Sequence, residues 1–199
     1  MKKVFIVFLA AVLTASYAQA QEMTYGVRAG FNLTNMWGGD GLDTKMKPGF
    51  QIGIVADYDI MEDFAFQMGL LFATQGFKTE ADEDDFSLTT NLNYLQIPMN
   101  AQYKLDLGGA KLLLQAGPYL GYGLGGKMTG KVGSKSVSEN IKFGDDGFNA
   151  FDFGLGFGAG LQFNNVQVGL GYNLGLAKFS ADGFRNNGLA VTLTYLLGK

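Results

Sequence analysis

The stretch "FDFGLGFGAGLQFNNVQVGLGYNLGLA", residues 151–177, has an apolar residue at almost every second position and glycine at most of the positions between. Alternate side chains of an extended chain point to opposite faces, so one face carries large apolar side chains and the other is almost bare. Asn164 and Asn165 divide the stretch and tolerate the positive φ of a two-residue turn. The stretch therefore predicts a β-hairpin in which Phe163 pairs with Val166.

The glycine face distinguishes two environments for this hairpin. Glycine is unfavourable in an ordinary strand, because it loses backbone entropy and offers no side chain for packing. A soluble β-sandwich would place Lys, Glu and Thr on this face, whereas the stretch carries Gly, Gln and Asn. Such residues suit the cramped interior of a narrow closed barrel. We therefore expect Gly158 and Gly171, which this register pairs, to face a barrel interior and the large apolar residues to face lipid.

The same alternation recurs along the chain. Strands are predicted at residues 25–33, 50–58, 64–72, 95–105, 112–122, 153–163, 166–176 and 189–197. Short connections (59–63, 106–110, 164–165) alternate with long ones (34–47, 78–87, 125–147, 178–187). Outer-membrane barrels have short periplasmic turns and long external loops, and closure satisfies every backbone group that lipid cannot. The predicted fold is all-β, an eight-stranded antiparallel up-and-down transmembrane β-barrel.

The N-terminus predicts export. Residues 1–20, "MKKVFIVFLAAVLTASYAQA", have a basic start, an apolar run and an Ala18-Gln19-Ala20 site, which is typical of a secretory signal peptide that is removed. The apolar run is too short for a comfortable membrane span. Residues 21–199 are then one outer-membrane β-barrel domain. The predicted location is the bacterial outer membrane.

The composition excludes several classes of function. The chain has no Cys and no His, so no disulfide, thiolate site, histidine-ligated zinc or Ser-His-Asp arrangement can form. General acid-base chemistry would fall to carboxylates, Lys or Tyr. The net charge of −3 lacks the excess of basic residues that binding to nucleic acid requires. We predict no catalytic residue, no metal ligand and no cofactor, and hence a protein that is not an enzyme.

Five segments of the predicted strands have distinctive sequences: "GLLFATQGFK" (69–78), "LNYLQIPMNAQYKL" (92–105), "QAGPYLGYGLGGK" (115–127), "GLGFGAGLQF" (154–163) and "GLGYNLGL" (169–176). Together they resemble the PorT-like family of small outer-membrane β-barrels. The Tyr-Leu-Gln-Ile-Pro block, with Pro98 inside a predicted strand, is the most particular of them. The resemblance implies a porin-like outer-membrane barrel with no enzymatic residues. The branch that names the family is tied to a secretion and gliding apparatus.

Four charged residues are predicted to point into the barrel. They are Arg28, Asp57, Lys104 and Asp152. A charge inside a narrow lumen needs a partner or water, so these residues form either an internal ion-pair network or a substrate site. The network is favoured, because buried charges must be satisfied in either case. Arg28 is expected to pair with Asp57 or Asp152.

Two other motifs suggest ligands. The acidic stretch Glu80, Asp82, Glu83, Asp84 and Asp85 is either a collector of divalent cations that bridge lipopolysaccharide phosphates or a solvated extracellular loop. The second is favoured, because the spacing lacks the Gly and the terminal Glu of a calcium loop. "GYGLGG", residues 121–126, matches the dinucleotide-binding pattern G-x-G-x-x-G. It is expected to close a strand and to lead into a polar loop instead of a helix, so nucleotide binding is disfavoured.

Three classes of function remain. The leading one is a small outer-membrane barrel with a structural or interaction role through its extracellular loops, as an accessory to a secretion machine or alone. Its partners would be outer-membrane lipid, lipopolysaccharide and a protein of the envelope. The second is a passive narrow pore, which side chains inside an eight-stranded barrel disfavour. The third is a lipid-modifying barrel enzyme, for which the lack of histidine leaves only carboxylate-based versions.

Overall fold

The computed structural model describes residues 23–38, 44–81, 86–133, 135–144, 149–178 and 183–197. Within these ranges the regular elements are nine strands: β1 (Met23–Trp37), β2 (Lys45–Met61), β3 (Phe64–Ala81), β4 (Phe86–Asp106), β5 (Lys111–Val132), β6 (Lys135–Ile141), β7 (Phe151–Phe163), β8 (Val166–Gly175) and β9 (Arg185–Leu197). No helix in the described part of the chain is long and apolar enough to span a membrane. The predicted signal peptide lies outside these residues.

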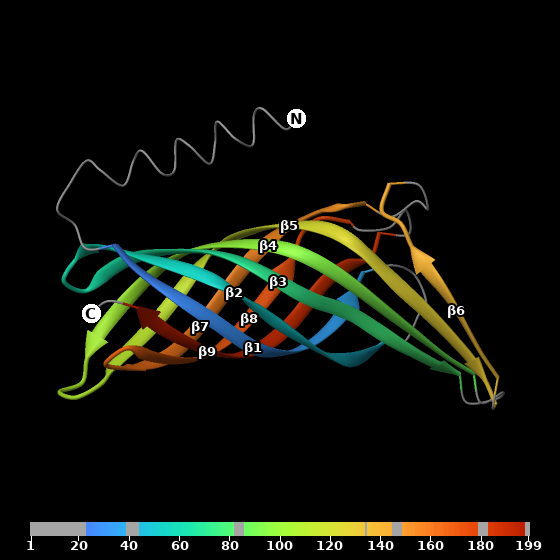
Figure 1. The fold of residues 1–199 in the computed structure, drawn as a ribbon, viewed down its shortest axis with the longest axis horizontal. Coiled ribbons are helices and arrows are strands. Elements are labelled where there is room, and N and C mark those ends of the chain that lie inside the picture. The colour runs from blue at the N-terminus through green and yellow to red at the C-terminus, as the bar shows by residue number, and fades with distance from the viewer. Residues whose placement is uncertain are drawn as a thin grey trace.

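Eight of the described strands close into a barrel, as Figure 1 shows. Each strand pairs antiparallel with the next along the chain, β7 follows β5 in the ring, and β9 closes it by pairing with β1. The turns 62–63, 107–110 and 164–165 lie at the same end as the start of β1 and the end of β9. We call this the turn end and the opposite one the loop end. The predicted eight-stranded up-and-down barrel is confirmed.

Side chains alternate between the lumen and the outer surface as expected. Ile54 and Leu170 keep 60% and 57% of their surface exposed on the outside, whereas Arg28 is buried in the lumen. In the hairpin of β7 and β8, Phe163 pairs with Val166, as predicted. Asn164 has the positive φ of 48° that such a turn requires. Within the barrel, every second side chain along a strand therefore points outward, and these positions carry the large apolar residues of the outer wall.

Two predicted loops are largely strand. β5 continues to Val132 and β6 returns beside it, so residues 125–147 contain a hairpin instead of a long loop. β3 and β4 likewise extend into the predicted loop 78–87 and pair up to Ala81 and Phe86. The "GYGLGG" segment therefore lies within β5 and does not close a strand. The prediction failed because these residues lack an apolar outer face, whereas neighbouring strands still supply backbone partners.

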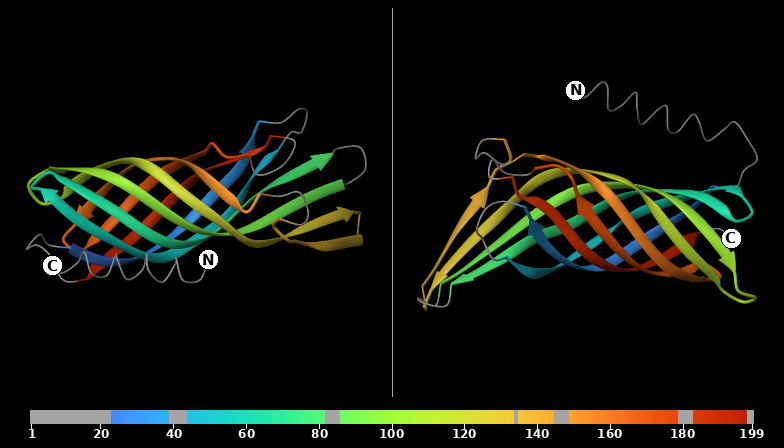
Figure 2. Two further views of the ribbon diagram at one scale, coloured as in Figure 1. Left: turned by 90° about the horizontal axis from the view of Figure 1, so that it is seen from above. Right: turned by 180° about the vertical axis from the view of Figure 1, so that it is seen from behind.

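The four strands β3 to β6 project beyond the rest of the barrel at the loop end, as Figure 2 shows. We call this part the extension, residues 76–81, 86–93, 125–132 and 135–141. A β-bulge marks its start on β5, because Tyr94 pairs with Gly123 and Asn93 pairs with Gly125, which leaves Leu124 as the extra residue. The bulge shifts the parity of β5. Met128 of β5 consequently packs against the buried cluster at the mouth of the lumen, although even-numbered residues of β5 face outward before the bulge.

Polarity in the extension is the reverse of that in the barrel. The inner face, which continues the lumen wall, is mostly apolar, although Lys135 and Glu139 of β6 share it. Its apolar residues are Phe77, Phe86, Leu88, Leu92, Met128, Val132, Val137 and Ile141. The outer face carries polar residues, and Thr129 Oγ1 lies 3.1 Å from Ser138 Oγ across that face. A polar outer face is what water requires and lipid does not tolerate. The outer face of the extension is therefore suited to contact with water and not to contact with lipid.

Candidate functional site

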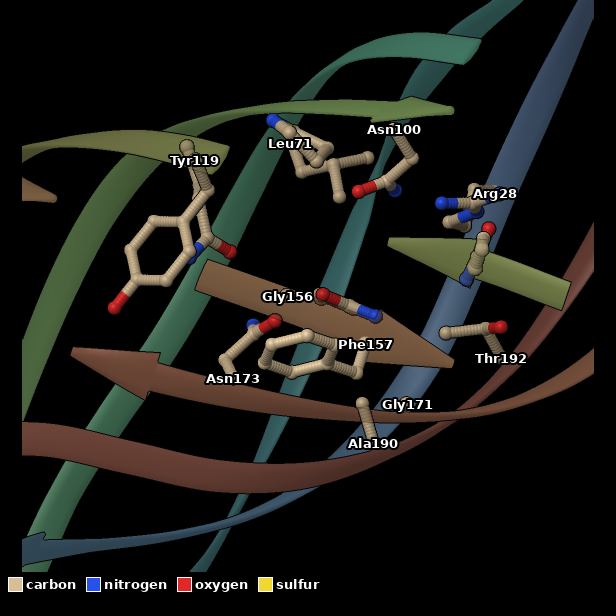
Figure 3. A pocket seen from close by; sticks show the side chains of 14 residues that line it. Arg28, Leu71, Asn100, Tyr119, Gly156, Phe157, Gly171, Asn173, Ala190 and Thr192 are labelled. Carbon is tan, nitrogen blue, oxygen red and sulfur yellow. The ribbon is translucent and has the colours of Figure 1, made fainter. Parts of the chain in front are cut away.

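The glycines of β7 form a bare strip on the lumen wall, and side chains of the neighbouring strand β5 lie over it. A Cβ atom on Gly154 would lie 2.7 Å from Tyr119 Cε1, and a Cβ on Gly158 would lie 2.8 Å from Gln115 Nε2. Both distances are shorter than any ordinary carbon contact. Tyr119 therefore leaves space only for glycine at position 154, and the end of the Gln115 side chain lies over Gly158. Figure 3 shows Tyr119 in the interior and the Asn173 side chain beside Gly156 of β7.

A polar network fills the lumen near the turn end. Arg28 Nη2 donates to Gln67 Oε1 at 2.5 Å, and Arg28 Nε donates to Thr194 Oγ1 at 2.8 Å. Gln67 Nε2 in turn donates to Asp57 Oδ1 at 2.5 Å. The guanidinium of Arg28 therefore reaches the Asp57 carboxylate through one glutamine side chain. These residues come from β1, β2, β3 and β9, so the network ties four strands together.

Lys104 provides the ion pair of this network. Its Nζ lies 3.6 Å from Asp57 Oδ2 and 2.6 Å from Asp59 Oδ1. Gln167 Nε2 also donates to Asp57 Oδ2, at 3.2 Å. Lys104 and Asp57 are both almost completely buried, so each needs an opposite charge nearby, which for Lys104 is supplied by Asp57 and by the closer Asp59. Sequence reasoning had placed Asp59 in a turn and did not include it.

Asp152 lies in a separate group near the loop end. Its Oδ2 accepts hydrogen bonds from Asn186 Nδ2 at 3.0 Å and from Tyr119 Oη at 3.5 Å. Asn186 also donates to Tyr94 Oη at 3.5 Å. Among the described residues Asp152 Oδ1 has no hydrogen-bond partner. Asn186 was missed because the last strand was predicted to start at residue 189, although it has the inward parity of that strand.

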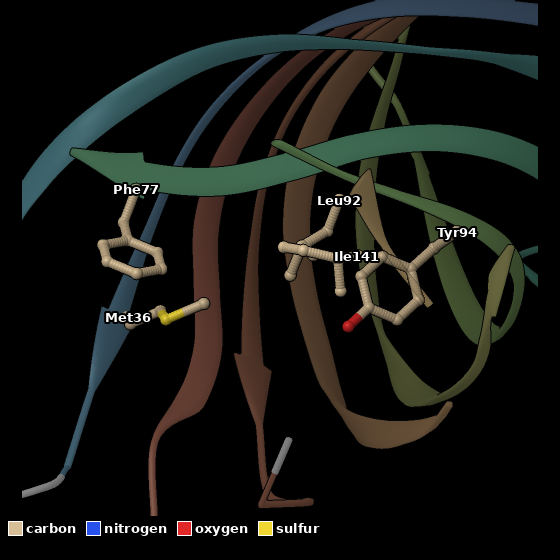
Figure 4. Packing of buried hydrophobic residues seen from close by; sticks show 5 residues of the cluster. All are labelled: Met36, Phe77, Leu92, Tyr94 and Ile141. Carbon is tan, nitrogen blue, oxygen red and sulfur yellow. The ribbon is translucent and has the colours of Figure 1, made fainter. Parts of the chain in front are cut away.

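An apolar cluster closes the lumen above Asp152. Its buried members, shown in Figure 4, are Met36, Phe77, Leu92, Tyr94 and Ile141. Phe143, which follows β6, packs against Tyr94 with ring centroids 5.6 Å apart. A Cβ on Gly123 would lie within 2.4 Å of the Phe143 ring, so glycine makes room for that ring. The end of β6 thus covers the mouth of the barrel.

Three small cavities remain among the described residues of the lumen, beside Arg28 and Tyr119. Their volumes are about 50, 20 and 10 Å³. Arg28 borders the first and the third, whereas Tyr119 borders the first and the second. A buried water needs roughly 10–15 Å³ on this measure. These cavities therefore have room for a few waters, and side chains divide them.

Most of the acidic stretch lies outside the described residues. Asp82, Glu83, Asp84 and Asp85 lie outside the described residues, and of Glu80 only the backbone is described, paired with Ser87 at the end of β3. Within the described ranges no three His, Cys, Asp or Glu side chains gather in a group that could hold a metal ion.

Comparisons with known proteins found one family model and several similar solved structures. The family model for the outer membrane protein beta-barrel domain matches residues 17–181. Similar solved structures include Ail, the attachment invasion locus protein of Yersinia pestis, in complex with the heparin analogue sucrose octasulfate, at 19% identity, with 88% of this chain and 99% of that chain covered and a TM-score of 0.46. Neisserial surface protein A has the same identity, coverage and TM-score. The N-terminal β-barrel domain of Pseudomonas aeruginosa OprF has 13% identity, 84% and 97% coverage and a TM-score of 0.31.

No curated protein matches the chain. The family model, in contrast, covers most of it, and the closed barrel with its apolar outer wall is the architecture that the model describes. The protein is therefore located in the bacterial outer membrane. It belongs to the family of the outer membrane protein beta-barrel domain.

Proposed function

We propose that the barrel is a closed scaffold and that the extension acts outside the cell as an interaction surface. The observation that carries this proposal is the reversal of polarity in the extension, whose outer face is polar where the barrel wall is apolar. Paired strands hold this surface rigidly above the membrane. A rigid, water-exposed surface suits recognition of other molecules.

The interior supports a scaffold more than a channel. Arg28, Gln67, Asp57 and Lys104 bridge the lumen near the turn end, and the apolar cluster covers it at the loop end. Removing one partner of such a buried network would leave an uncompensated charge, so the closed barrel depends on keeping every member of the network. Side chains fill the interior of a narrow eight-stranded barrel, so a scaffold role requires no path for ions or solutes through the lumen.

The partners follow from the surfaces that the protein exposes. The apolar outer wall contacts outer-membrane lipid, and Lys127 and Lys131 on the outer face of the extension suit the phosphates of lipopolysaccharide. The third proposed partner, after lipid and lipopolysaccharide, is another protein of the envelope. The resemblance to the PorT-like family supports an accessory role beside a secretion machine. The function needs no catalytic residue and no cofactor.

Site-specific photo-crosslinking on living cells tests the interaction role. A photoreactive amino acid at Thr129 on the outer face of the extension should give a discrete covalent adduct with another envelope component. The same amino acid at Leu170, on the lipid-facing wall, is the matched control and should give lipid adducts only. If Thr129 gives no adduct while the folded protein is present at normal abundance, the proposed role of the extension is wrong.

A narrow pore is the second candidate function. The observation that favours it is the succession of small cavities along the lumen. We expect the refolded protein in planar bilayers to show no sustained open state, and Arg28→Ala to lower stability without creating conductance. Steady, ion-selective conductance that changes with Arg28→Ala would establish the pore instead.

A further inference from the structure

β6 is the free edge of the extension. It pairs with β5 along one side and comes last in the strand order, so its other side has no partner among the described strands (Figure 1). Six of its seven residues are exposed. The backbone N–H and C=O groups along such an edge can pair with a strand of another chain.

The sequence of β6 is complementary to itself. Residues 135–139 read Lys-Ser-Val-Ser-Glu, so an antiparallel second copy centred on Val137 would place Lys135 opposite Glu139 and Ser136 opposite Ser138. Val137 would lie opposite Val137 of the second copy. Opposite charges, hydroxyl pairs and β-branched pairs are the cross-strand combinations that stabilise antiparallel sheets. Val137 is also 76% exposed, so pairing would cover apolar surface that water now contacts.

We propose that β6 is a self-recognition strand that pairs with β6 of a second copy of this chain. This inference rests on the interaction role proposed above and names its partner. The contact is isologous, because each chain contributes the same strand and each Lys135 meets a Glu139 across a two-fold axis. A partner strand with a basic residue opposite Lys135 or an acidic residue opposite Glu139 would place like charges together, which disfavours such a strand.

The direction of β6 determines how the two barrels are arranged. β5 runs out to Val132 and β6 returns from Lys135 towards the mouth of the barrel at Ile141. In an antiparallel pair, the barrel end of one β6 lies beside the outer tip of the other. The two barrels therefore lie at opposite ends of the paired strands. This arrangement suits copies in two membranes that face each other.

A charge swap in detergent micelles tests the pairing. The wild-type protein should form a reversible dimer in analytical ultracentrifugation. Lys135→Glu alone and Glu139→Lys alone should each weaken the dimer about tenfold or more, because each replaces two attractive pairs by two repulsive ones.

Mixing the two variants supplies the positive control. An equimolar mixture should form heterodimers, because one chain then carries two acidic residues on β6, the other carries two basic residues, and both cross-strand pairs are attractive again. The control Lys111→Glu makes the same charge change on β5 at the turn end, away from β6, and should leave the dimer intact.

Vesicles test the arrangement of the barrels. Vesicles of phosphatidylcholine that carry either single variant should not cluster by themselves, but the two populations should cluster when mixed. A heat-modifiable folded band for every variant on gels shows that loss of clustering is not loss of folding.

The outcomes separate this inference from the proposed function. A wild-type protein that stays monomeric, or a mixture of variants that fails to associate, overturns the second copy as partner. If the crosslinker at Thr129 nevertheless captures another envelope component, the interaction role stands with a different partner. If neither dimers nor a Thr129 adduct are found, the self-pairing of β6 and the interaction role of the extension are both wrong. Dimers that form side by side in one membrane, without clustering of vesicles, would contradict the antiparallel pairing.

Discussion

Gly154 and Gly171 face the same lumen but have different amounts of space. A Cβ on Gly154 would lie 2.2 Å from the Leu174 carbonyl oxygen and 2.7 Å from Tyr119 Cε1, whereas the nearest atom to a Cβ on Gly171 would be the Phe157 carbonyl oxygen at 3.6 Å. Gly171 also borders the largest of the luminal cavities described. Lack of space therefore explains the glycine at position 154 but not the glycine at position 171, although both residues face the lumen.

The difference between the two glycines is measurable. Gly154→Ala should lower the free energy of unfolding by about 1–3 kcal/mol, because the added methyl group meets backbone and an aromatic ring that cannot both move. Gly171→Ala should change it by less than about 0.5 kcal/mol. Urea unfolding of the refolded protein in vesicles compares the two variants. Equal effects of both substitutions would contradict a lumen packed against the glycines of β7.

Lys104 is the residue whose loss should harm the polar network most. Lys104→Met removes the ion pair of the buried Asp57 and should destabilise the barrel by about 3–5 kcal/mol. Lys127→Met, on the outer face of the extension, is the control and should have almost no effect. Adding Asp57→Asn to Lys104→Met should restore part of the stability, because the unpaired charge is gone. A double variant no better than Lys104→Met would mean that Asp57 is neutralised by other groups.

At the scale of elements, β5 serves two environments. Its first part has an apolar outer face against lipid, and beyond the bulge at Leu124 its outer face is polar. The bulge changes which parity faces out, so the apolar residues turn from the membrane to the inner face of the extension. One strand thereby links the membrane barrel to a water-exposed surface without an intervening loop.

Arginine substitutions on outward positions should locate the edge of the membrane. Leu170→Arg introduces a charge near the middle of β8 on the lipid-facing wall and should destabilise the barrel by about 2–4 kcal/mol. Thr129→Arg points the same charge outward from the extension and should cost less than about 0.5 kcal/mol. The yield of folded protein in vesicles measures the effect of each substitution. Similar yields for the two variants would mean that one of these positions has been assigned to the wrong environment.

At the scale of the whole molecule, the two ends of the barrel have different roles. The turn end has only short connections, and the loop end has the extension and the cluster that covers the lumen. Outer-membrane barrels insert with their short turns in the periplasm. We therefore expect the extension to lie outside the cell, where a partner or another cell can reach it.

Cysteine labelling tests this orientation, because the chain has no cysteine of its own. Ser136→Cys on the exposed β6 should react on intact cells with a reagent that does not cross the outer membrane. Asn165→Cys, in the turn between β7 and β8, should react only after the cells are opened. The reverse pattern would place the extension in the periplasm and exclude a role at the cell surface.

The alternation of side chains, the order of the eight barrel strands and the pairing of the hairpin at residues 151–177 all follow from local sequence. These features are local: side chains alternate with period two, and a two-residue turn sets the register of the strands beside it. The inward direction of Arg28, Asp57 and Lys104 follows from the same rule. A lipid-facing wall makes the pattern strong, because it requires an apolar side chain at each outward position.

The tertiary structure decided which inward groups meet and where the strands end. Arg28 reaches Asp57 through Gln67, and Lys104 is the direct ion partner, because barrel closure sets the relative height of strands that are distant in the chain. Residues 125–132 and 135–141 become strands because β4 and β5 offer them backbone partners, not because they have a lipid-facing pattern. Local sequence carries the period of a strand, but only the assembled sheet supplies the neighbours that extend it beyond the membrane.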